Sequence, residues 1–161
     1  MKCLRIGIIG AGFGSYGLRP AFQRDPRCEV AAIATSRDWE ELVRSDEIAA
    51  VAIATPPVFQ PAIALAALSY GKPVFAEKPI AANLADAEKL LRAAETSKLA
   101  NVVDFLFPEL VTFAKAKELL DRGGIGTPLH ISAEWIFWSH DHRNKVTTWR
   151  TDSHAGGGAL A

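Results

Sequence analysis

Residues 8–15 read IIGAGFGS. Two isoleucines end a short apolar run, Gly10 and Gly12 follow, and a segment of helical character begins directly afterwards. A strand that leads through Gly-x-Gly into a helix is the context of the fingerprint that binds the pyrophosphate of a dinucleotide. Ser15 stands where that fingerprint usually has Gly or Ala. The stretch therefore predicts a dinucleotide loop, and its alternative is a tight strand-to-helix turn without a ligand.

The glycines of this loop have different expected tasks. Gly10 makes the tight turn at the end of the strand, because glycine adopts backbone angles that other residues avoid. Gly12 lacks a Cβ and lets a pyrophosphate approach the backbone at the positive end of the following helix. Phe13 and Gly14 complete the loop, and we count them among the expected cofactor-binding residues.

Short apolar runs alternate with longer segments of helical period over the first 104 residues. The candidate strands are residues 4–9, 29–34, 50–54, 73–76 and 101–105. They are almost continuously apolar, as strands covered on both faces should be. This alternation predicts an α/β fold, a Rossmann-like doubly wound parallel sheet.

The helices between these strands carry start and stop signals. A helix is expected over residues 61–70, where Gly71 is placed to end it. Asn83 is placed to cap a second helix, whose apolar stripe recurs at steps of three or four. A third helix is expected over residues 109–122, before a cluster of glycines.

The pattern changes after Pro128. Alternate positions become apolar, which predicts a half-buried strand that includes Leu129, Ile131, Ala133, Trp135 and Phe137. We therefore expect a Rossmann domain over residues 1–124 and the truncated start of an α+β substrate domain over residues 125–161. An unpaired strand edge with aromatic side chains favours association, so the expected outcomes are a homo-oligomer or, as the alternative, disorder beyond about residue 125.

Composition narrows the functional classes. The 161 residues carry 18 Lys and Arg against 18 Asp and Glu, and this balance offers no basic footprint for nucleic acid. Arg5 interrupts the N-terminal apolar run, and prolines divide the richest apolar segment, so neither a signal peptide nor a membrane span is expected. Cys3 and Cys28 are too few for a disulfide framework. A soluble, reduced, cytoplasmic protein is predicted.

No metal site is expected. His140 and His142 lie two residues apart in a polar stretch and offer too few fixed donors for zinc. Both are interpreted as residues of a solvated loop.

The segment after the second expected strand bears on the choice of nicotinamide nucleotide. NAD sites usually have Asp or Glu there, to accept hydrogen bonds from the ribose hydroxyls. This chain has Thr35, Ser36 and Arg37. A hydroxyl and a guanidinium suit a 2′-phosphate, so Ser36 and Arg37 favour NADP(H) over NAD(H). The alternative is that Arg37 is merely solvated and that Asp38 caps the next helix.

The chain resembles the Gfo/Idh/MocA oxidoreductases, which join a Rossmann domain to an α+β domain with an open sheet. The resemblance rests on five segments in order: residues 10–14 (GAGFG), 54–57 (ATPP), 71–79 (GKPVFAEKP), 124–129 (GIGTPL) and 156–160 (GGGAL). It implies reversible hydride transfer between a nicotinamide and a small molecule such as a sugar, a polyol or a related carbonyl compound.

The resemblance also implies roles for single residues. Lys78 is the expected catalytic residue, which contacts the reacting oxygen and assists proton transfer, with Glu77 and Pro79 beside the nicotinamide. An ammonium at the carboxyl end of a parallel strand lies in the ligand crevice, where we expect it to be desolvated. The alternative is a structural ion pair. The remaining implied cofactor contacts are Thr55, Pro56, Pro57, Trp149 and Arg150. The alternatives are a plain strand-ending turn at residues 55–57 and no cofactor contact for Trp149 and Arg150.

Three departures from the family pattern qualify these expectations. Gln60 replaces a His found in many relatives, and Leu106 and Phe107 stand where relatives have an Arg. The Asp and His that follow the last glycine run in the family have no counterpart here, and His154 receives no such role. The chain is therefore expected to be a fragment of an oxidoreductase, and the alternative is a non-catalytic nucleotide-binding module or sensor.

Overall fold

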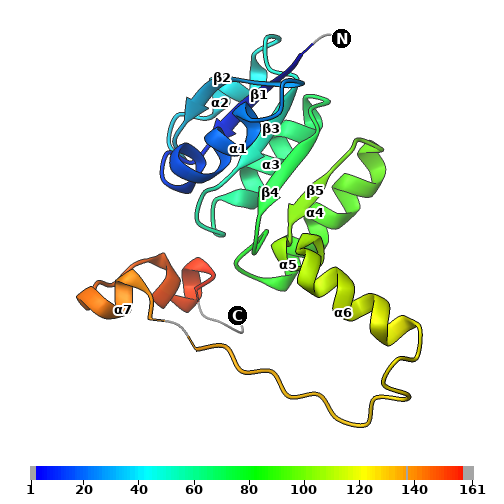
Figure 1. Cartoon of the computed structure of the whole chain (residues 1–161). Coiled ribbons are helices and arrows are strands. Elements are labelled where there is room, and N and C mark those ends of the chain that lie inside the picture. Colours follow the sequence, from blue (N-terminus) through cyan, green and yellow to red (C-terminus); the bar gives the residue numbers. More distant parts are fainter. Residues whose placement is uncertain (1–2, 137, 158–161) are drawn as a thin grey trace. The chain divides into compact units, whose positions relative to one another are not determined.

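A five-stranded parallel sheet forms the centre of the N-terminal part (Figure 1) in the computed structural model, which describes residues 3–136 and 138–157. The strands are β1 (Leu4–Ile9), β2 (Cys28–Ala34), β3 (Ala50–Ile53), β4 (Val74–Glu77) and β5 (Val102–Asp104). Their order is β2-β1-β3-β4-β5, and every neighbouring pair is parallel. The predicted strands are confirmed to within one residue at each end.

Helices cover both faces of this sheet. The covering elements are η1 (Gly14–Leu18), a π-helical turn, and the α-helices α1 (Arg19–Gln23), α2 (Glu40–Arg44), α3 (Gln60–Ser69) and α4 (Leu84–Ser97). Successive residues of a strand point to opposite faces, and in β1 Ile8 packs with Leu18 of η1 while Ile9 packs with Val43 of α2 and Ile63 of α3. The core is therefore split by the sheet, and the predicted Rossmann-like doubly wound fold is confirmed.

The helix ends follow the predicted signals. Asn83 Oδ1 accepts the backbone N–H of Asp86 at 2.9 Å and so caps α4. Gly71 follows α3 with φ +69°, the left-handed conformation in which helices commonly end. Both ends are thus set by local chemistry that the sequence displays.

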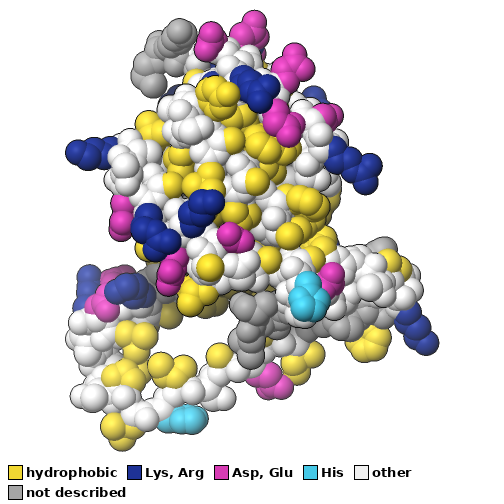
Figure 2. Space-filling model, turned by 180° about the vertical axis from the view of Figure 1, so that it is seen from behind, with side chains coloured by type: hydrophobic (Ala, Val, Ile, Leu, Met, Phe, Trp, Pro, Cys, Tyr) yellow, Lys and Arg dark blue, Asp and Glu magenta, His cyan; other side chains and the backbone are white. Residues whose placement is uncertain are grey.

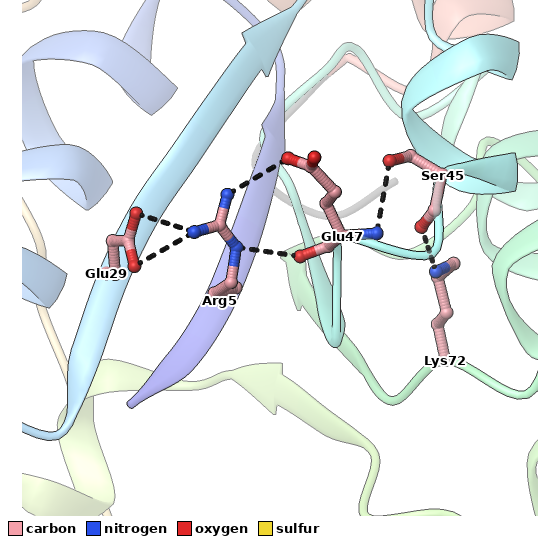
Figure 3. A network of polar contacts seen from close by, with 5 residues as sticks. All are labelled: Arg5, Glu29, Ser45, Glu47 and Lys72. Atoms are coloured by element: carbon pink, nitrogen blue, oxygen red, sulfur yellow. Dashed lines mark hydrogen bonds and ion pairs between the residues drawn. The ribbon is translucent and has the colours of Figure 1, made fainter. Parts of the chain in front are cut away.

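Polar contacts tie together the amino edge of the sheet (Figure 3). Lys72 is buried, and its Nζ donates to the carbonyl oxygens of Ser45 at 2.7 Å and Ile48 at 2.5 Å. Arg5 of β1 forms ion pairs with Glu29 and Glu47, each at 3.1 Å. These groups join the loops that precede β3 and β4, at the edge opposite to the glycine loop.

The chain forms two compact units. The first contains the sheet and, in addition, the segment that begins at Thr148; the second is Phe105–Thr147. Helices of the second unit are α5 (Leu106–Glu109), α6 (Val111–Asp121) and α7 (His140–Asn144). The helix expected over residues 109–122 corresponds to α6, the short α5 before it was not expected, and α7 replaces the loop expected around His140.

The strand expected after Pro128 is wrong for the residues that the structure describes. Residues 129–136 pair with no other strand, and their side chains are exposed, Leu129 to 95% and Ile131 to 80%. Phe137 lies outside the described residues. A strand needs a partner for its backbone groups, and the described part of this unit contains no other strand. The alternating apolar residues indicate a preference for a β-strand, but the described part of this unit offers no second strand with which to pair.

The surface shows two further features. Charged side chains of both signs are interspersed over the face seen in Figure 2, consistent with the zero net charge. Among the described helices, none combines the length and the apolar character that crossing a bilayer requires.

Candidate functional site

The glycine loop lies at the carboxyl end of β1, between β2 and β3. Gly10 has φ +122°, and its N–H donates to the carbonyl oxygen of Ala34 at 2.8 Å. On the other side, the N–H of Ala54 donates to the carbonyl oxygen of Ile9 at 2.8 Å. A Cβ on Gly10 would lie 2.4 Å from the Ala54 carbonyl oxygen, so the loop passes too close to β3 for any side chain at this position.

Gly12 and Gly14 have different surroundings. A Cβ on Gly14 would lie 2.7 Å from Ile8 Cγ2, because η1 packs closely on β1. A Cβ on Gly12 would have no atom within 4 Å. Phe13 lies across Gly17, and its ring meets that of Tyr16 edge-on at 5.4 Å between centroids. The open side of the loop is therefore at Gly12, whose carbonyl oxygen accepts the backbone N–H groups of Ser15 at 3.0 Å and Tyr16 at 3.4 Å at the start of η1.

The loop after β2 is held by one carboxylate. Asp38 Oδ1 accepts the backbone N–H and the hydroxyl of Thr35, both at 2.6 Å, and these hydrogen bonds lower the pKa of Asp38. The backbone N–H of Arg37 donates to the Thr35 hydroxyl oxygen at 3.2 Å. Asp38 therefore does not cap α2, whose N-cap is Trp39. Arg37 is exposed beside the half-buried Ser36.

The turn after β3 is buried and joined to the turn after β4. Thr55 is 6% exposed, and Pro57 is fully buried. Gln60, at the start of α3 and 1% exposed, donates through Nε2 to the carbonyl oxygens of Thr55 at 3.2 Å and Pro79 at 3.1 Å. Sequence reasoning treated Gln60 only as a replaced His, whereas the structure makes it a bridge between two predicted cofactor-binding turns.

We expect a Gln60→Leu substitution to lower the free energy of unfolding by about 1–3 kcal/mol, because the buried Thr55 carbonyl and the partly buried Pro79 carbonyl lose their donor. Leu is similar in volume, so packing is largely retained. Urea denaturation followed by circular dichroism measures the change, with Gln23→Leu on the exposed end of α1 as the control. If the two variants have the same free energy of unfolding, the stabilising role assigned to the hydrogen bonds of Gln60 is wrong.

The turn after β4 carries the expected catalytic lysine. Lys78 is exposed, so the desolvation expected for its ammonium is not found in the described structure. The shifted group is its neighbour: burial raises the pKa of Glu77 to about 7, helped by a hydrogen bond with Asp104 and by the negative charge of Asp104, and opposed by Lys78. Asp104, at the end of β5, was not among the residues singled out from the sequence.

The segment from Thr148 packs on the first unit. The short 3₁₀-helices η2 (Trp149–Thr151) and η3 (Ser153–Ala155) lead to Gly156, which has φ +85°. A Cβ on Gly156 would lie 2.7 Å from Pro57 Cβ, so this glycine permits direct contact with the turn after β3. The Arg150 guanidinium lies 4.7 Å from the centroid of the Trp149 ring. This distance is that of a cation–π contact.

The carboxyl edge of the sheet brings together most of the predicted site residues. The glycine loop follows β1, Ser36 and Arg37 follow β2, residues 55–57 follow β3, and Glu77 and Lys78 end β4. The chain leaves β1 toward β2 on one side of the sheet and leaves β3 toward β4 on the other side. The crevice between two such strands is where open α/β sheets bind ligands.

The residues at this edge fit a dinucleotide. The open backbone at Gly12 leaves room for a pyrophosphate beside the start of η1. Among the described residues, the buried Thr55 Oγ1 and Gln60 Oε1 have no hydrogen-bond partner. Such groups suit the polar atoms of a ribose or a carboxamide. The fit therefore extends from the phosphate loop to the turn after β3.

Comparisons with known proteins agree with this geometry. The family model described as "Oxidoreductase family, NAD-binding Rossmann fold" matches residues 34–105. A second one, described as "GFO/IDH/MocA C-terminal domain", matches residues 113–161. Both models belong to one family, and they occur here in the order expected from the resemblance.

Curated relatives match over nearly the whole chain. An uncharacterised oxidoreductase of Synechocystis is 30% identical over 98% of this chain and 47% of its own length. The levoglucosan dehydrogenase of Pseudarthrobacter phenanthrenivorans is 30% identical over 99% of this chain and 48% of its own length. The chain spans about half the length of the curated relatives it matches.

Solved structures give the same result. An NAD-binding oxidoreductase from Klebsiella pneumoniae superposes with a TM-score of 0.70 at 28% identity, over 77% of this chain and 40% of that one. A 3-ketoreductase from Actinomadura kijaniata in complex with NADP has a TM-score of 0.68 at 29% identity. The match covers 78% of this chain and 46% of that one. The fold of the described sheet is therefore that of nicotinamide-dependent oxidoreductases.

Proposed function

This chain belongs to the Gfo/Idh/MocA oxidoreductases, and on that premise we propose that it binds NADP(H) at the carboxyl edge of its sheet. The proposed reaction is reversible hydride transfer between the cofactor and a sugar, a polyol or a related small molecule. Two relatives support that substrate class by name, the levoglucosan dehydrogenase and an inositol 2-dehydrogenase of Pseudomonas fluorescens. The observation that carries the proposal is the convergence of the loops after β1, β3 and β4.

Each loop has a distinct part in this proposal. The bound nicotinamide supplies the hydride donor or acceptor. Gly12 leaves the backbone open for the pyrophosphate, and the buried Thr55 offers its hydroxyl to the ribose or nicotinamide side. Lys78 donates a hydrogen bond from Nζ to the reacting oxygen and exchanges a proton with it. Glu77 and the pair Trp149 and Arg150 complete the cofactor contacts.

The choice of NADP(H) rests on the loop after β2. Asp38 already accepts two hydrogen bonds from Thr35, and this holds its carboxylate within the loop. Arg37 and Ser36 remain beside the expected position of the ribose 2′ group. A guanidinium binds phosphate through charge-assisted, paired hydrogen bonds.

We expect Arg37→Ala to weaken NADPH binding about 10-fold to 100-fold, because one charge-assisted contact with the 2′-phosphate is lost. NADH has no such phosphate, so its dissociation constant should change less than about twofold on the same reasoning. Fluorescence titration of the wild type and the variant with both nucleotides measures the four constants.

The matched control is Arg24→Ala, which removes an exposed arginine at the end of α1 and should change neither constant. Tighter binding of NADH than NADPH by the wild type would overturn the cofactor assignment. Failure of both nucleotides to bind would overturn the proposed function itself.

A further inference from the structure

Two carboxyl groups stand side by side at the carboxyl edge of the sheet. Glu77 ends β4 and Asp104 ends β5, and they are register partners in the parallel pairing of these strands. Register partners on neighbouring strands lie about 5 Å apart and point to the same face. Both residues are half-buried, and burial together with the neighbouring Asp104 carboxyl group raises the pKa of Glu77.

The charges around this pair do not balance two ionised carboxylates. Lys78, the next residue after Glu77, is the cation that acts on it. The strand on the other side of β4 is β3, which leads from Ile53 into Ala54 and Thr55, all uncharged. Asp104 lies on an edge strand, whose other side has no strand neighbour. The described surroundings therefore supply one positive charge for two acids.

Electrostatics then favours a single proton on the pair. Two ionised carboxylates in contact repel each other, and partial burial makes water a poorer screen for that repulsion. A proton held between them removes one negative charge and completes the hydrogen bond. In agreement with this geometry, the pKa of Glu77 is raised to about 7 by burial and by Asp104.

We propose that Asp104 is a positioning residue that shares a proton with Glu77 and thereby sets the negative charge beside Lys78 and the nicotinamide. This inference rests on the proposed function, because it takes the turn after β4 to lie next to the cofactor ring. Asp104 itself touches neither cofactor nor substrate in this proposal and acts through Glu77.

The consequence is a charge that depends on pH near neutrality. As the pH rises through about 7, the shared proton leaves to water and the pair gains one negative charge. The nicotinamide ring is a cation in NADP⁺ and neutral in NADPH. A second negative charge beside the ring therefore favours NADP⁺ over NADPH as the pH rises.

The first measurement tests the pair without any nucleotide. Carbon-13 NMR of the side-chain carboxyl groups should show Glu77 titrating near pH 7 in the wild type. In Asp104→Asn, an amide donates to the Glu77 carboxylate and favours its ionised form, so the titration should move down toward the usual carboxyl value of 4.5. A Glu77 titration near 4.5 in the wild type, or one that stays near 7 in Asp104→Asn, would overturn the shared proton.

The second measurement tests the effect on the cofactor. Dissociation constants for NADP⁺ and NADPH are determined by fluorescence titration at pH 6 and pH 8. We expect the preference for NADP⁺ to rise about threefold to tenfold between these values in the wild type, the size expected for one screened charge near the ring. In Asp104→Asn the preference should be the same at both pH values.

Asp46→Asn is the control, because it makes the same chemical change on an exposed residue before β3, at the opposite edge of the sheet. It should keep the wild-type pH dependence. If both nucleotides bind but their ratio in the wild type does not change with pH, the role of the pair is wrong. If neither nucleotide binds, the proposed function fails, and the NMR titration still decides whether the proton is shared.

Discussion

A Gly10→Ala substitution is expected to lower the free energy of unfolding by about 3 kcal/mol or more, because two costs coincide at this residue. The first is backbone strain, since φ +122° lies in a region that residues with a Cβ avoid. The second is steric, since the new methyl group would lie 2.4 Å from the Ala54 carbonyl oxygen. Urea denaturation followed by tryptophan fluorescence measures the loss.

The clash at Gly10 cannot be relieved by a side-chain movement. Ala54 belongs to the backbone that leaves β3, and its N–H is committed to the Ile9 carbonyl oxygen. Moving Ala54 away would therefore break the hydrogen bond that joins β1 to β3 at the site. Nucleotide binding should be lost together with stability, because the same hydrogen bond holds the loop against the edge of the sheet.

Gly12→Ala is the matched variant that separates binding from folding. A methyl group here meets no atom within 4 Å, so stability should change by less than about 1 kcal/mol. The methyl would occupy the approach of the pyrophosphate, and the dissociation constant for NADPH should rise about tenfold or more. Unchanged NADPH affinity in Gly12→Ala would remove the loop from the proposed site, and a Gly10→Ala protein of normal stability would contradict the loop geometry.

The sequence predicted best those features that short-range chemistry determines. Gly10 and the cap Asn83 depend on the backbone within a few residues, and both have the expected conformation or contact. The five strands were recognisable because burial on both faces leaves a continuous apolar run. The Rossmann-like order then follows from the alternation of strands and helices.

Features that depend on distant partners were not predicted. Gln60 and Pro79 are 19 positions apart in the chain, and Glu77 and Asp104 meet only because β4 and β5 pair in one register. The spacing of residues along the sequence does not predict the register in which β4 and β5 pair. The strand expected after Pro128 was wrong for a related reason. An alternating apolar pattern indicates which face of a strand would be buried, but it does not identify the strand with which it would pair.

The desolvation expected at Lys78 is found at its neighbour Glu77 instead. The lysine was expected to be desolvated, yet its side chain is exposed and the half-buried group is Glu77. An exposed ammonium beside a carboxyl pair is well placed to meet a substrate that arrives from solvent.

We therefore expect Lys78→Met to reduce turnover about 100-fold or more, the range typical of a lost proton-transfer group. The dissociation constant for NADPH should stay within about twofold, because Met keeps the length of the side chain and no phosphate contact is assigned to Lys78. Turnover is followed by NADPH absorbance with the best substrate from a panel of sugars and polyols. Lys89→Met makes the same change on an exposed position of α4 and should leave turnover unaltered. Equal turnover in the two variants would remove Lys78 from the chemistry, because both lose one ammonium and only Lys78 lies at the carboxyl edge of the sheet.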